Sequence, residues 1–130
     1  MWSRRWFLAL TVLGCLTPSL ARGQGGPSRL TPLVVGWERY FTITSETAPG
    51  GGRVTGTIVN EWGFAARRIQ LLVEGLDAAG QVTGQSVVWL GHDLPPGGRG
   101  YFDVRAPAGT RHRVSVFAFD WVQTASLSAP

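Results

Sequence analysis

The chain has 130 residues, of which 44% are hydrophobic, and its 12 basic and 8 acidic residues give a formal net charge of +4. This length suits one small domain with one modest core. All the basic residues are arginines, and they are scattered along the chain, so they do not mark a nucleic-acid-binding face.

The first 21 residues have the pattern of an export signal. Arg4 and Arg5 precede an apolar run over 6–16, and 19–21 (Ser-Leu-Ala) places small residues where a signal peptidase reads. We expect cleavage after Ala21, which would leave a periplasmic or secreted chain with 10 arginines, 8 acidic residues and no cysteine. The apolar run is shorter than the about 20 residues that a transmembrane helix needs, so the mature chain is expected to lack a membrane span.

Two features of this signal leave its processing open. Residues 3–8 (Ser-Arg-Arg-Trp-Phe-Leu) resemble the twin-arginine motif, which would mean that the domain folds before export. A general secretory signal can also begin with two arginines. Residues 12–15 (Val-Leu-Gly-Cys) resemble a lipobox, in which Cys15 would carry a lipid anchor, and the Ser-Leu-Ala site competes with it.

After the signal, residues 22–32 are rich in Gly and Pro and predict a flexible leader, and 125–130 predict a flexible tail. The domain is expected at 33–124. Within it, runs of alternating apolar and polar residues bounded by turn residues predict six strands, at 36–45, 53–60, 67–76, 81–90, 100–105 and 111–122. Asp77 and Gly80 predict a tight turn after the third strand, and we expect Asn60 to tie its own turn through side-chain hydrogen bonds.

Six or seven short strands at this spacing predict an all-β fold, an antiparallel two-sheet sandwich. The apolar positions that share the inward phase predict its core. They are Phe41, Ile43, Val54, Ile58, Ile69, Leu71, Val73, Val88, Leu90, Phe102, Val104, Val114 and Val116.

The turns and apolar positions resemble a known family. Residues 56–60 (Gly-Thr-Ile-Val-Asn) are followed by an alternating strand that ends in the Asp-x-x-Gly turn at 77–80, then by the Pro-Gly turn at 95–97 and Phe102. This pattern resembles the FxLYD-type domain, although Gly75-Leu76-Asp77 lacks the aromatic residue of its name. The resemblance implies an immunoglobulin-like sandwich of exported bacterial or archaeal proteins. It brings no catalytic residues.

Catalytic and metal-binding patterns are weak in this sequence. His92 and Asp93 could serve as a base and its orienting acid in a small hydrolase, but neighbouring residues in an extended loop point apart, and we expect a structural role. We expect His112 to be exposed at the start of the last strand. Two separated histidines and scattered acids form no metal-ligand set, so neither enzymatic activity nor a cofactor is expected.

The aromatic residues carry the functional prediction. Trp62 and Phe64 lie in a predicted loop, and Trp89 and Trp121 fall on the phase opposite to the core valines, which predicts an apolar face for a protein partner in the cell envelope. Stacking of tryptophans on cell-wall carbohydrate is the alternative. Phe117 and Phe119 could share this face, or the last strand could change face at a bulge and bury them.

Overall fold

The computed structural model describes residues 29–123. The predicted export signal, the cleavage site at Ala21, the lipidation site at Cys15 and the 125–130 tail therefore lie outside the described residues.

The described residues form six strands and one short helical turn. In chain order these are η1 (Trp37–Arg39), β1 (Phe41–Thr47), β2 (Arg53–Asn60), β3 (Ala65–Leu76), β4 (Val82–Trp89), β5 (Arg99–Arg105) and β6 (Arg111–Val122). The tight turn after β3 is as predicted: Asp77 Oδ1 accepts hydrogen bonds from the backbone N–H groups of Ala79 and Gln81, and Gly80 takes a positive φ of 84°.

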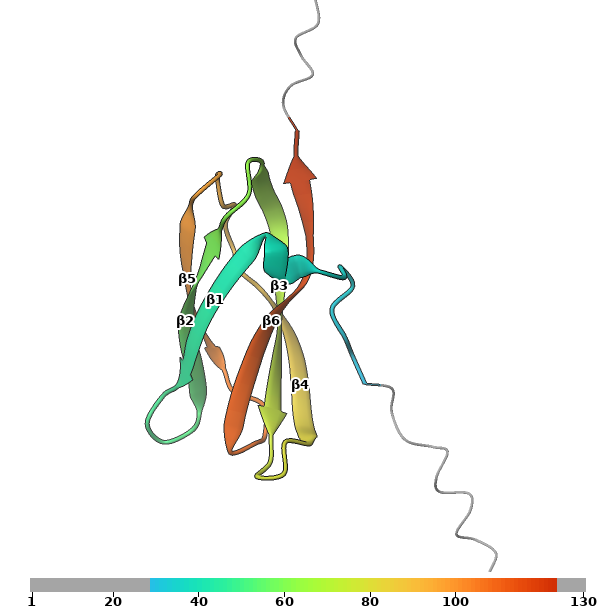
Figure 1. The fold of residues 1–130 in the computed structure, drawn as a ribbon. Coiled ribbons are helices and arrows are strands. Elements are labelled where there is room, and N and C mark those ends of the chain that lie inside the picture. Colours follow the sequence, from blue (N-terminus) through green and yellow to red (C-terminus); the bar gives the residue numbers. More distant parts are fainter. Residues whose placement is uncertain (1–28, 124–130) are drawn as a thin grey trace, which may run out of the picture.

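The strands pair into two antiparallel sheets of three strands, with the orders β1-β2-β5 and β4-β3-β6. Figure 1 shows the two sheets as the two layers of the molecule. Ile43 lies opposite Ile58 in the first sheet, and Leu71 lies between Val88 and Val116 in the second. The predicted all-β, two-sheet antiparallel fold is confirmed.

The core lies between the sheets and takes apolar side chains from both. All thirteen predicted core residues either are buried or pack against the buried cluster, with Ile43, Val88 and Val104 in the second group. Four further apolar residues that the alternation did not predict are also buried: Ala66, Leu72, Leu76 and Leu94.

The predicted first strand is wrong at its start. Residues 37–39 form a 3₁₀ turn, and β1 begins at Phe41. The turn is fixed locally, because Gly36 takes a φ of 81° and the N–H groups of Arg39 and Tyr40 donate to the carbonyls of Gly36 and Trp37. Alternation alone had placed this segment in a strand.

β6 contains the bulge that the sequence left open. Leu71 pairs with Val116 while its neighbour Gln70 pairs with Ala118, so Phe117 is an extra residue in β6. The extra residue reverses the phase of the strand. As a result, Phe119 and Trp121 pack against the core.

A segment that we name the strap, residues 29–35, lies on the outer side of the second sheet (Figure 1). Leu30 is hydrogen bonded to the side chain of Gln85 on β4, and the Leu33 N–H donates to the Phe117 carbonyl on β6. The strap thus passes over β3, where Leu72 is fully buried although it points away from the core. The predicted flexible leader includes 29–32, which the structure places against the domain.

Candidate functional site

An aromatic cluster fills one end of the sandwich. The rings of Tyr40 and Trp121 have centroids 5.3 Å apart, and Trp121 also contacts Phe41 at 5.9 Å and Phe119 at 4.7 Å. Most of these pairs meet edge to face, an arrangement that adds about 0.5–1.5 kcal/mol per pair beyond burial. The cluster gives this end a rigid base.

Two partly exposed rings lie on this base, both in the loop between β2 and β3. Trp62 meets Tyr40 edge-on at a centroid distance of 4.7 Å, and Phe64 lies 6.3 Å from Trp121. Each of the two residues keeps 42% of its surface exposed. We name Trp62 and Phe64 the end patch.

Asn60 holds the loop that carries the end patch. Its side chain is fully buried, and its Nδ2 donates to the carbonyls of Phe64, Leu94 and Pro95 at 2.8, 3.1 and 3.2 Å. Its Oδ1 accepts from the Trp62 N–H at 2.9 Å. The prediction that Asn60 ties its own turn is confirmed, and the same side chain also fixes the loop before β5. The end patch is therefore presented on a fixed backbone.

The structure brings three of the four predicted partner-binding residues together. Trp62, Phe64 and Trp121 belong to the aromatic end, with Trp121 half-buried beneath the other two. Trp89 lies elsewhere, at the end of β4 opposite Gln70, and is 62% exposed. Its neighbour Val88 packs on the core, so alternation puts Trp89 on the outer face of the second sheet.

Tyr40, which links Trp62 to Trp121, was missed by the sequence prediction. The predicted strand at 36–45 places Phe41 and Ile43 inward, and its alternation therefore puts Tyr40 on the outward phase. The signal that could have found it is local: Gly36 before three residues that close a turn marks an end to extended structure.

The two histidines differ in burial and in hydrogen bonding. His92 and Asp93 are both exposed in the loop before β5, whose hydrogen bonds are made by Asn60, Ala66 and Leu94 instead. The expectation that His112 is exposed was wrong. His112 is half-buried: its Nε2 lies 2.8 Å from the Pro107 carbonyl and its Nδ1 lies 2.9 Å from the Thr47 hydroxyl.

The contacts of His112 are those of a structural residue. A carbonyl can only accept, so Nε2 carries the proton and donates to Pro107, which leaves Nδ1 to accept from the Thr47 hydroxyl. Both ring nitrogens of a neutral imidazole are thereby satisfied. His112 joins β6 to the end of β1 and to the preceding loop.

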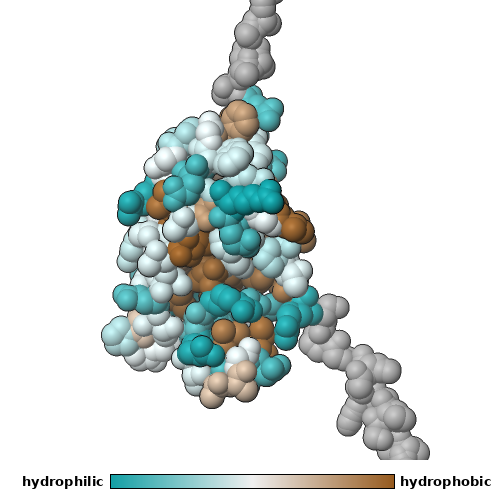
Figure 2. Space-filling view, in the orientation of Figure 1, coloured by the Kyte–Doolittle hydropathy of each residue, from teal (hydrophilic) through white to brown (hydrophobic). Residues whose placement is uncertain are grey.

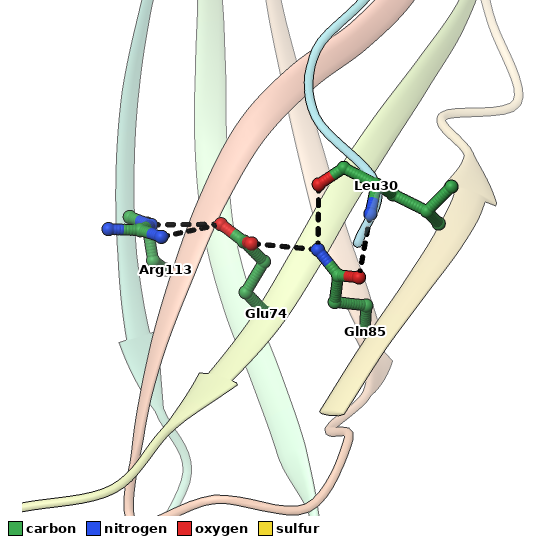
Figure 3. A network of polar contacts seen from close by, with 4 residues as sticks. All are labelled: Leu30, Glu74, Gln85 and Arg113. Atoms are coloured by element: carbon green, nitrogen blue, oxygen red, sulfur yellow. Dashed lines mark hydrogen bonds and ion pairs between the residues drawn. The ribbon is translucent and has the colours of Figure 1, made fainter. Parts of the chain in front are cut away.

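A polar network lies beneath the strap (Figure 3). Glu74 on β3 is only 5% exposed, and its Oε1 accepts from Arg113 on β6 at 2.9 Å. Its Oε2 accepts from Gln85 Nε2 at 2.9 Å, which fixes the orientation of the Gln85 amide. The same amide binds both main-chain groups of Leu30. Its Nε2 donates to the Leu30 carbonyl at 2.8 Å, and its Oε1 accepts from the Leu30 N–H at 3.0 Å.

Two shallow hollows, each of about 280 Å³, lie on opposite outer faces. One is beneath the strap, between Trp37, Glu74 and Ser115, and the other lies over β1, β2 and β5, beside Tyr101. In the view of Figure 2, apolar side chains form separate areas divided by hydrophilic ones.

Among residues 29–123 no three His, Cys, Asp or Glu side chains come together as metal ligands, and no helix of this part of the chain is long and apolar enough to cross a membrane.

No family model matches the chain, and no significant match was found among curated proteins or solved structures.

Proposed function

We propose that this chain is an exported, non-catalytic binding module that takes a protein partner of the cell envelope through the end patch. The observation that carries the proposal is the pairing of two partly exposed aromatic rings with a backbone fixed by the buried Asn60. Aromatic anchors on a rigid support lose little conformational entropy on binding, and such residues are enriched at protein interfaces. The apolar run and small-residue site at 1–21 support export.

The ring geometry favours a protein partner over the carbohydrate alternative. A sugar platform at this end would need two exposed rings lying in one plane. The Tyr40 and Trp62 rings are inclined at 80°, and the Phe64 and Trp121 rings at 60°. Each exposed ring is therefore inclined to the aromatic ring that it contacts, so neither pair forms a flat platform, and such an inclined pair suits an apolar side chain of a partner.

We also propose that the domain is immunoglobulin-like, of the FxLYD type that its turns resemble. The strand order supports this proposal. In immunoglobulin domains the first, second and fifth strands (A, B and E) share one sheet, while C and F pair in the other with C′ beside C. The orders β1-β2-β5 and β4-β3-β6 follow this arrangement without the last strand.

Site-specific photo-crosslinking in the intact cell envelope tests the binding proposal. A photoreactive residue at Trp62 should give an adduct with one defined protein. The matched control is the same residue at Tyr101, which is 63% exposed on β5, away from the end patch. Equal adducts from both positions, or none from Trp62, would contradict the proposal. An adduct that consists of glycan would favour the carbohydrate alternative. Mass spectrometry of the product would also give the mature N-terminus.

A further inference from the structure

The two sheets expose four edge strands, and three of them are protected. β5 carries Arg99 and Arg105 at its ends and Asp103 between them. β1 carries Glu46 and packs beside β6 where the two sheets meet. β6 carries three charged residues and a bulge, and the strap bonds to its Phe117 carbonyl. Charges, bulges and covering segments are the usual means by which proteins block unwanted strand pairing.

β4 differs from the other edges. Its sequence, Val-Thr-Gly-Gln-Ser-Val-Val-Trp over Val82–Trp89, has neither a charged residue nor a proline. The register shift with β3 lies at its first residues, so the pairing over 84–89 is regular. A regular, uncharged edge is a template for another strand.

The register of β4 with β3 defines which main-chain N–H and C=O groups of β4 are available to a further strand. The Leu90 N–H donates to the Ile69 carbonyl, and Leu90 continues the β3–β4 register. In an antiparallel pair, the residues that bond to the partner strand alternate with residues that face away from it. Counting back from Leu90, the main-chain groups of Gln85, Val87 and Trp89 point to the edge with which no strand of residues 29–123 pairs.

These three positions are self-complementary. If two copies of β4 pair antiparallel about Val87, each Gln85 lies opposite Trp89 of the second copy, and the two Val87 residues face each other. No like charges meet in this arrangement. The same operation on β5 would place Arg99 opposite Arg105, which is unfavourable.

The outer face gives a second, independent reason for this pairing. The side chains of Gln85 and Trp89 both lie on that face, and Gln85 holds Leu30 there. Pairing would bring Trp89 of the second copy beside Leu30. Trp89 is 62% exposed and Leu30 is 41% exposed, and the two-fold axis would form this contact twice, so both apolar surfaces of each copy would be covered.

We propose that β4 is a homodimerisation edge, through which a second copy of this chain extends the β4-β3-β6 sheet across a two-fold axis at Val87. The proposal does not depend on the end patch, which lies in the β2–β3 loop beside Trp121 of β6, the strand at the opposite edge of the sheet from β4. A crosslinking result at Trp62 therefore leaves it unaffected.

Sedimentation equilibrium tests this proposal. The protein is purified in the form that the expressing cell leaves after any processing of its N-terminal signal. The wild type should sediment with twice the chain mass at high concentration. Val87→Lys puts two like charges opposite each other at the axis and should weaken self-association by about tenfold or more. The matched control is Thr44→Lys, an exposed position in the middle of β1, which should leave the dimer unchanged. Trp89→Ser, which removes the ring and keeps the backbone, should also weaken it.

A mixture of Val87→Lys and Val87→Glu provides the sharpest outcome, because opposite charges at the axis should restore a mixed dimer. Unfolding curves would verify that each variant remains folded. The proposal is overturned by a wild type that stays monomeric up to millimolar concentration, by a Val87→Lys variant that still dimerises, or by a charge-swap mixture that stays monomeric. A complex in which β4 pairs only with a different protein would overturn it as well.

Discussion

The outer faces of the two sheets differ in what covers them. On the β1-β2-β5 sheet, the outward residues of β1 are exposed, and burial alternates regularly along the strand. On the β4-β3-β6 sheet, β3 is buried without interruption from Leu71 to Leu76, on both faces. The strap lies on the second of these faces, where it bonds to Gln85 on β4 and to Phe117 on β6.

A short segment can thereby change the energetic role of the sheet face on which it lies. Beneath the strap, Leu72 acts as core, and the carboxylate of Glu74 is removed from water and needs partners. On the bare face, Thr44 and the ion pair of Arg53 with Asp103 remain solvated. Substitutions on the covered face should therefore cost much more than matched substitutions on the bare face.

The largest effect is expected at Leu72. Leu72→Ala should lower the free energy of unfolding by about 2–4 kcal/mol, because it leaves a cavity beneath the strap. Thr44→Ala on the bare face should change it by no more than about 0.5 kcal/mol. Urea unfolding followed by tryptophan fluorescence measures both. Similar losses for the two variants would mean that the strap does not cover Leu72 in solution.

A smaller loss is expected at Glu74. Glu74→Ala should cost about 1–3 kcal/mol, because it leaves the Gln85 amide and the Arg113 guanidinium without their buried acceptor. The cost is limited, since the Arg113 side chain is 56% exposed and can be hydrated. The same unfolding assay applies. A neutral result would show that the network contributes nothing to stability.

Gln85→Ala should act mainly on the strap itself. The substitution removes both hydrogen bonds to the Leu30 main chain, so the global loss should be only about 1 kcal/mol while the strap detaches. Hydrogen exchange of the Leu33 amide, which donates to Phe117, should accelerate, and exchange of the β1-β2-β5 amides should not. Unchanged protection of Leu33 would argue that Gln85 does not hold the strap.

The smallest effect is expected for the ion pair on the bare sheet. Arg53→Ala removes the contact with Asp103, and both side chains are about half exposed. Pairs of this kind contribute at most about 1 kcal/mol, and salt screens them. Thermal unfolding at low and high salt should therefore differ little between this variant and the wild type. A loss as large as that of Glu74→Ala would erase the contrast between the two faces.

Much of the fold could be predicted because strand alternation is a local signal. β2 and β6 have their predicted bounds, and the Asp77 turn forms as its side chain suggests. Leu72 was missed because the alternation assigned it to the solvent face. A signal for it existed: Leu71, Leu72 and Val73 are three consecutive apolar residues, which indicates a strand covered on both faces.

The candidate site was predictable only in part. The loop that carries Trp62 and Phe64, and the anchoring role of Asn60, follow from the residues between two strands. The grouping with Trp89 does not hold in the structure, because Trp89 and Trp121 belong to opposite edge strands of their sheet. Alternation assigns a phase to each residue, but it does not say which strands become neighbours.

Local patterns in the sequence specify most of the extended segments, the turns and the apolar positions, since each of these depends on a few consecutive residues. Two features depend on tertiary packing instead. The pairing of β6 with β3 places the bulge at Phe117 and so turns Phe119 and Trp121 into the core. The strap is held by Gln85 and Phe117 over the face of the sheet on which Leu72 is buried. Both depend on contacts between segments far apart in the chain, which no local pattern encodes.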